Sequence, residues 1–92
     1  MNIPNMTKEQ EKELKTRAKL AKPLVWVGKN GLTEEIIEQT KTFLKKRKLV
    51  KIKLLNSYVE AHDKKMAVME LVLKTESHLV DFTGFMITLY KR

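Results

Sequence analysis

The chain has 92 residues, 42% of them hydrophobic and 33% charged, which predicts one folded domain over residues 1–92 and excludes a disordered chain. The absence of cysteine excludes a disulfide framework, a thiolate metal site and a thiol nucleophile. A net charge of +8, no apolar run near the roughly 20 residues of a membrane span, and no apolar signal-peptide segment lead us to expect a cytoplasmic protein with a polyanionic partner.

The first predicted element is a helix that begins at Thr7 and ends before Pro23. Thr7 and Gln10 have the spacing of a capping box, and residues 1–6 are expected to be a flexible N-terminus. The thin apolar stripe of this helix comprises Leu14, Ala18, Leu20 and Ala21. Residues 24–27, LVWV, are β-branched or aromatic and too few for a helix, so they predict a short buried strand.

Residues 28–31, GKNG, are predicted to form a tight loop between this strand and a second helix. Gly28 and Gly31 permit positive φ angles and close approach to a ligand, because no Cβ intervenes. The following helix begins with unpaired N–H groups, Lys29 adds a cation, and Asn30 can donate to a phosphate oxygen. The spacing differs from that of a nucleotide P-loop. A backbone-phosphate site and a plain strand-to-helix turn both account for this pattern.

The second helix is predicted from its cap, Thr33, to the basic run of residues 45–48. Its inner stripe comprises Ile36, Ile37, Thr40, Phe43 and Leu44. Residues 49–55 then alternate as a half-buried strand. The apolar face of that strand holds Val50, Ile52 and Leu54, and its basic face holds Lys51 and Lys53.

Residues 56–77 return to helical spacing and predict a third helix. It begins either at Ser57, with Glu60 completing a second capping box, or near Asp63. Its predicted inner stripe, with the methionines as core filler, comprises Val59, Met66, Met69 and Leu73. The remaining residues predict two short strands that turn at Gly84. In the last strand, one face comprises Phe85, Ile87 and Leu89, and the other comprises Met86, Thr88 and Tyr90.

The predicted fold class is therefore α+β, a two-layer α/β arrangement with a mixed four-stranded sheet and three helices in the order α-β-α-β-α-β-β. All the excess positive charge lies in residues 1–54, which hold 14 of the 19 Lys and Arg and 6 of the 11 acids. Lys41, Lys45 and Lys48 share one face of the second helix. We predict a single basic surface beside the loop, and solvated helix ends are the alternative. It comprises Lys19, Lys22, Lys45, Lys48, Lys51 and Lys53.

Two aromatic residues are candidates for stacking on nucleic-acid bases. Trp26 lies within an apolar strand and is predicted to pack in the core, so Tyr90, next to Lys91, is the better candidate. His62 and His78 have no ligand-spaced partners and are interpreted as ordinary polar positions. Without a nucleophile–base pair or a paired acid set, we expect no catalysis, metal or cofactor.

The segment KPLVWVGKNGLTEEII, from Lys22 to Ile37, resembles the signature of the CRM domain, the RNA-binding module named for chloroplast RNA splicing and ribosome maturation. Its stand-alone forms are the YhbY-like proteins. The similarity covers about residues 7–91 and includes LVKIKLL and the closing TGFMITLYK. In this family the last strand often ends in Leu-Tyr-Arg, whereas this chain has Lys91, which lacks the bidentate fork of arginine.

The resemblance implies the same mixed sheet with three helices, like the C-terminal domain of translation initiation factor three. It also implies RNA contact at the loop and association with ribosomal RNA or pre-ribosomal large subunits. We therefore expect a monomeric, non-enzymatic RNA-binding protein. A basic module docking on ribosomal or assembly-factor proteins, and a small phosphotransfer enzyme, are the alternatives. The predicted RNA-binding residues are Gly28, Lys29, Asn30, Gly31, Lys19, Lys22, Lys45, Lys48, Lys51, Lys53 and Tyr90.

Overall fold

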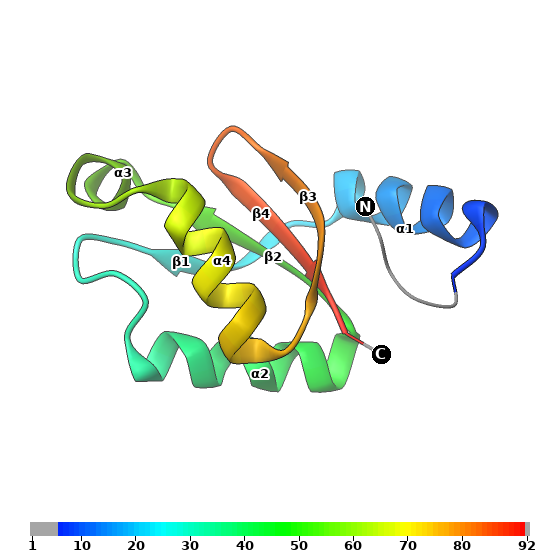
Figure 1. Ribbon diagram of the computed structural model, residues 1–92, viewed down its shortest axis with the longest axis horizontal. Helices are drawn as coiled ribbons and strands as arrows, with labels where there is room; N and C mark the ends of the chain where they lie inside the picture. Colours follow the sequence, from blue (N-terminus) through cyan, green and yellow to red (C-terminus); the bar gives the residue numbers. More distant parts are fainter. Residues whose placement is uncertain (1–5, 92) are drawn as a thin grey trace.

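The computed structural model describes residues 6–91, in which a four-stranded sheet carries helices on both faces (Figure 1). The elements are α1 (Lys8–Leu20), β1 (Pro23–Val27), α2 (Glu34–Arg47), β2 (Leu49–Leu54), α3 (Asn56–Ala61), α4 (Lys64–Thr75), β3 (His78–Thr83) and β4 (Met86–Tyr90). The predicted α+β class with a mixed four-stranded sheet is confirmed. Within the described range, no helix is long and apolar enough to cross a membrane.

The strands lie in the order β1-β2-β4-β3. β1 and β2 are parallel, and α2 is the crossover between them, since parallel neighbours cannot be joined by a tight turn. β4 is antiparallel to both β2 and β3. The β3–β4 hairpin turns at Gly84 as predicted, with a φ of +59° that a glycine adopts without strain.

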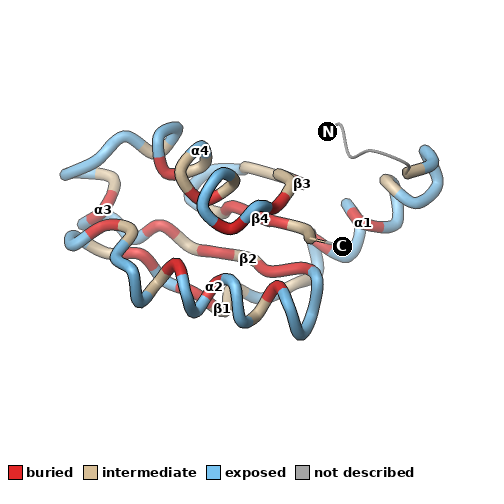
Figure 2. Tube along the Cα trace, turned by 60° about the horizontal axis from the view of Figure 1, so that its bottom comes forward, coloured by how far each residue is buried: buried red, intermediate tan, exposed pale blue. Residues whose placement is uncertain are grey.

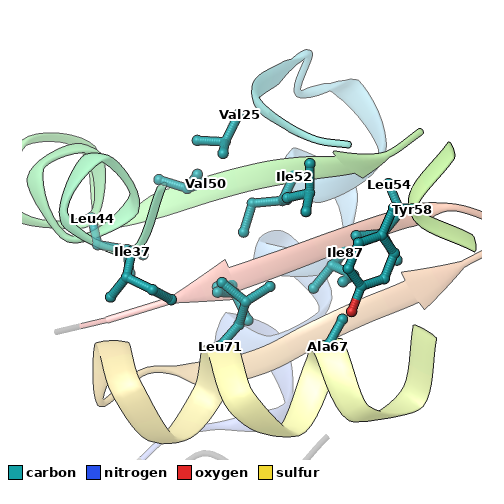
Figure 3. Close-up of a cluster of buried hydrophobic side chains, with 12 residues drawn as sticks. Val25, Ile37, Leu44, Val50, Ile52, Leu54, Tyr58, Ala67, Leu71 and Ile87 are labelled. Atoms are coloured by element: carbon teal, nitrogen blue, oxygen red, sulfur yellow. The ribbon is translucent and has the colours of Figure 1, made fainter. Parts of the chain in front are cut away.

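The main core lies between the sheet and the helices α2 and α4, where the labelled side chains point toward one another (Figure 3). The strands contribute Val25, Val27, Val50, Ile52, Leu54, Ile87 and Leu89, and the helices contribute Ile37, Leu44, Ala67 and Leu71. Tyr58 of α3 closes one end of this core. Burial raises the pKa of the Tyr58 phenol, and the nearby carboxylates of Glu70 and Asp63 raise it further, so Tyr58 stays uncharged at neutral pH.

α1 packs on the opposite face of the sheet and covers only one end of it. Leu14 and Ala18 are buried there with Leu49 and Val80, and Met6 and Tyr90 pack at the margin. The predicted capping box is present, because Thr7 Oγ1 accepts from the N–H of Gln10 at 3.1 Å and Gln10 Oε1 accepts from the N–H of Thr7 at 2.9 Å. Most of α1 projects from the body and is exposed (Figure 2).

Two details of the N-terminal prediction differ from the structure. Leu20 was assigned to the apolar stripe of the first helix, but its side chain is exposed. The predicted flexible segment spans residues 1–6, of which residues 1–5 lie outside the described range. Met6 is described and packs against the Leu14 cluster, which differs from the flexibility predicted for this residue.

The predicted third helix is two helices, α3 and α4, separated at His62 and Asp63. His62 leaves the helical region with a φ of −139°, and Asp63 Oδ1 then accepts from the N–H of Lys65 at 2.9 Å to cap α4. The proposed capping box at Ser57 is absent, because the N-cap of α3 is Leu55, which makes no side-chain cap bond. The break divides one predicted helix into two without changing the sheet.

The predicted inner stripe of α4 is wrong. Met66, Met69 and Leu73 are 59%, 58% and 74% exposed, and the buried residues are Ala67, Leu71 and Thr75. The correct stripe is displaced around the helix, because α4 is apolar on most of its circumference and the break at His62 resets the helical phase. Phe85 likewise lies in the hairpin turn and is exposed, although Ile87 and Leu89 are buried as predicted.

Candidate nucleic-acid interface

The G-x-x-G loop is a tight turn between β1 and α2, at the end of the sheet where β1 finishes. The N–H of Gly31 donates to the carbonyl of Gly28 at 2.9 Å, which leaves Lys29 and Asn30 exposed at the corners. Gly31 has a φ of +77°, whereas Gly28 does not have a positive φ. Only one of the two glycines is therefore needed for the backbone conformation.

The side chain of His62 contacts the loop on the side that faces the protein. Its Nε2 donates to the carbonyl of Lys29 at 3.0 Å, and its ring stacks on Tyr58 with centroids 4.7 Å apart. A Cβ at Gly31 would lie 3.4 Å from this Nε2, whereas a Cβ at Gly28 would make only ordinary contacts. His62, interpreted as an ordinary polar position, thus makes a contact with the loop that the sequence did not predict. Nothing in the sequence pairs positions 29 and 62, since only the fold brings them together.

This hydrogen bond also determines how the tip of the loop faces solvent. In a trans peptide the carbonyl and the next N–H point in opposite directions. The Lys29 carbonyl faces His62, so the N–H of Asn30 points away from the protein. The Gly28 carbonyl faces into the turn, so the N–H of Lys29 points outward as well. Neither N–H donates to a group within residues 6–91, and both are available to an acceptor.

A hollow of about 390 Å³ lies between the loop and the first turns of α2. Thr33 caps α2 as predicted, because its Oγ1 accepts from the N–H of Ile36 at 3.3 Å. Glu34 and Glu35 occupy the first turn, and Glu35 lines the hollow. Their charge opposes an anion at the helix end, so the donors of Lys29 and Asn30 are better placed for phosphate than the helix N-terminus is.

The predicted single basic surface is divided into separate groups. Lys51 and Lys53 project from the face of the sheet opposite α2, because their strand neighbours Val50, Ile52 and Leu54 enter the core under α2 and α4. Lys45 and Lys48 lie at the far end of α2, about 20 Å from the loop for a helix of this length. Lys19 and Lys22 flank the α1–β1 junction, and both are exposed.

These lysines share one property, the absence of an ion-pair partner within residues 6–91. The ion pairs formed there involve Lys41, Lys74 and Lys91 instead. The Nζ of Lys91 also donates to the carbonyl of Thr75 at 3.2 Å, which satisfies the C-terminal end of α4. Lys91, where the resemblance implies an arginine, therefore links the end of the last strand to α4.

The exposure of the two aromatic candidates is the reverse of the prediction. Trp26, predicted to lie in the core, is 52% exposed on the outer side of β1. Tyr90, the predicted stacking residue, is partly buried against the Leu14 and Val80 cluster beneath α1. The assignment of Trp26 failed because its side chain projects from the sheet face opposite Val25 and Val27, and α1 covers that face only at its other end.

The described residues form no cluster of three His, Cys, Asp or Glu side chains that could hold a metal ion. The loop itself offers the N–H donors of Lys29 and Asn30 and the ammonium group of Lys29. This chemistry is suited to holding an anionic group in place.

The chain is similar to known proteins over nearly its whole length. Residues 6–91 match the model of the CRS1 / YhbY (CRM) domain. A "Probable RNA-binding protein" of Pseudomonas aeruginosa is 32% identical over 95% of this chain and 82% of its own length. The "Probable RNA-binding protein YqeI" of Bacillus subtilis is 34% identical over 94% of this chain and 88% of its own. The solution structure of a hypothetical Staphylococcus aureus protein has a TM-score of 0.74 at 31% identity, covering 95% of this chain and 88% of that one. The chain belongs to the CRS1/YhbY (CRM) domain family.

Proposed function

We propose that this protein binds RNA and that the loop Gly28–Gly31 holds the RNA backbone. The observation that carries the proposal is the outward direction of the N–H groups of Lys29 and Asn30, which follows from the hydrogen bond of His62 to the loop. Two backbone donors and a lysine ammonium at one tip match the acceptor oxygens of a phosphate. Because phosphate is common to all sequences, this contact positions the RNA without reading its bases.

The RNA we propose is structured ribosomal RNA, free or within pre-ribosomal large subunits of the cytoplasm, and the role is non-enzymatic. Two relatives carry the name RNA-binding protein, and the resemblance described above implies ribosome maturation. Unpaired lysines on both sides of the sheet add attraction that does not depend on sequence. These are Lys19, Lys22, Lys45, Lys48, Lys51 and Lys53.

The proposal is tested by titrating protein-free ribosomal RNA fragments at several salt concentrations. The variant Lys29→Asp/Asn30→Asp reverses the charge at the loop tip. Its matched control, Lys15→Asp/Thr16→Asp, makes the same charge change at two adjacent exposed positions of α1. All three proteins are first compared for their thermal midpoints, so that unfolding is not mistaken for a lost contact.

We expect the loop variant to bind at least tenfold more weakly than the control. We also expect the wild type to show a log–log salt slope near −4, from about six phosphate contacts at about 0.7 each on single strands. Equal loss in both variants would show that the loop is not the contact. Absence of binding to naked RNA at low salt would overturn the function itself.

A second candidate function, docking on a ribosomal or assembly-factor protein, is favoured by the exposed surface of α4. Met66, Met69 and Leu73 line a groove of about 580 Å³ next to Tyr58 and His62. Exposed apolar side chains in a contiguous group are typical of protein contacts. Strong binding to pre-ribosomal particles, with no binding to their deproteinised RNA, would select this candidate.

A further inference from the structure

The sheet has an outer face that α1 covers only in part. Paired residues in a sheet project to the same side, and Trp26 pairs with Lys53, which in turn pairs with Met86. Their neighbours Val25, Ile52 and Ile87 are core residues, so this row lies on the opposite side. Lys51, two residues before Lys53, projects to the same side. We call the surface formed by Trp26, Lys51, Lys53 and Met86 the outer sheet face.

This face leaves a large aromatic side chain in solvent. The indole of Trp26 is 52% exposed, although α1 buries Leu49 and Val80 at the other end of the same side. Indoles bury much area when they are covered, so an open one beside a covered region is typical of a binding surface. The fold does not require an indole at position 26, because Val25 and Val27 already anchor β1 in the core.

The charged residues around Trp26 indicate which kind of ligand this face binds. Lys53 lies directly opposite Trp26 on the adjacent strand and Lys51 one step along, and neither forms an ion pair within the described chain. Among the strand residues, the acid on this side of the sheet is Asp81, which pairs with Thr88 and lies two strands from Lys51, about 10 Å away. Its carboxylate accepts a hydrogen bond from Thr83. Both unpaired cations lie on the β2 side of the aromatic plane, where they suit the phosphates next to a nucleobase stacked on Trp26.

We propose that the outer sheet face is a second RNA-contact site, where Trp26 stacks on an unpaired base and Lys51 and Lys53 hold the adjoining phosphates. This inference rests on the proposed RNA-binding function and adds to it a preference for single-stranded segments. Trp26 lies two residues before Gly28, about 7 Å along the strand, so one RNA segment reaches both the loop and the ring.

Trp26 is the single tryptophan of the chain, so its fluorescence reports on this face alone. The experiment titrates wild type with a short single-stranded oligouridylate and with a duplex of equal length. Binding is followed both by Trp26 emission and by the anisotropy of a labelled RNA. We expect the single strand to quench Trp26 with the same midpoint as the anisotropy curve, and the duplex to bind without equal quenching.

Two substitutions complete the test. Trp26→Leu keeps an apolar residue suited to a strand and is expected to weaken single-strand binding by about 5- to 100-fold. Trp26→Phe keeps an aromatic plane and is expected to recover part of that loss, which a role in folding alone would not predict. Both variants are checked for an unchanged thermal midpoint.

The outcomes separate this inference from the function on which it rests. RNA binding by anisotropy with no change in Trp26 emission, and equal binding by Trp26→Leu, would overturn the stacking site and leave the loop contact standing. Absence of any RNA binding by wild type would overturn both. A shift of Trp26 emission with protein concentration alone would show that a second copy covers the face, which also overturns the inference.

Discussion

Helices α2 and α4 pack side by side on one face of the sheet, but they present opposite chemistry to solvent. Inside, they are alike, since each contains a buried threonine whose Oγ1 donates to the carbonyl four residues earlier, in Thr40 at 2.8 Å and in Thr75 at 2.6 Å. Outside, α2 ends in a basic run, whereas α4 exposes Met66, Met69 and Leu73. Each helix packs into the core through one side only. The residues on its other side can therefore serve a function without loss of core packing.

The largest effect is expected where the two helices are alike. Leu44→Ala in α2 and Leu71→Ala in α4 each remove a fully buried side chain and leave a cavity in the same core. Each is expected to lower the free energy of unfolding by about 2–5 kcal/mol. Urea unfolding followed by circular dichroism measures both. A cost below about 1 kcal/mol at either leucine would mean that the corresponding helix does not contribute equally to the core.

The next largest effect on stability is expected in the loop that leads into α2, where His62, the residue before the cap of α4, contacts the loop. Gly31→Ala places a side chain at a φ of +77° and 3.4 Å from the ring of His62, so we expect a loss of about 1–2 kcal/mol in the free energy of unfolding. Gly28→Ala meets only ordinary contacts and should change it by less than about 0.5 kcal/mol.

A double variant separates the two causes of the expected loss at Gly31, the backbone strain at positive φ and the contact with the ring of His62. Adding His62→Ala to Gly31→Ala removes the ring but not the positive φ, so most of the loss should remain after the cost of His62→Ala alone is subtracted. If the two glycine variants lose equal stability, the asymmetry of the loop seen in the structure does not hold in solution.

The sequence was sufficient to predict the parts of the molecule in which polar and apolar residues alternate unambiguously. In α2 the charged residues leave one apolar stripe, and its deepest members, Ile37 and Leu44, are buried as predicted. In β2 the alternation of lysine with aliphatic residues gave the correct faces. The G-x-x-G loop was located from two glycines and the helix cap that follows them.

The remainder depended on contacts between distant positions. α4 is apolar on most sides, so its periodicity could not distinguish the buried Leu71 from the exposed Leu73. The exposure of Trp26 depends on where α1 packs, because α1 covers only the other end of the same sheet face. The role of His62 requires α3 to lie beside the loop, and no local pattern encodes that proximity.

The difference between the outer surfaces predicts a difference in salt dependence. Lys45 and Lys48 carry no ion pair within residues 6–91, so Lys45→Gln and Lys48→Gln should each make the log–log salt slope of RNA binding shallower by about 0.7. Lys74 of α4 is paired with Glu70 at 3.1 Å, and Lys74→Gln should leave the slope unchanged. Equal changes at all three positions would mean that total charge, and not the α2 end, determines binding.

The smallest effect is expected on the outer side of α4, where the comparison with α2 is sharpest. Met69→Gln and Leu73→Gln replace exposed apolar side chains, so each should change the free energy of unfolding by less than about 0.5 kcal/mol, with an unchanged urea m-value. Leu71, two residues from Leu73 on the same helix, provides the internal reference. If Leu73→Gln instead costs as much as Leu71→Ala, and the cost grows with protein concentration, then a second copy covers this surface in solution. The stability of α4 would in that case depend on association, and that of α2 would not.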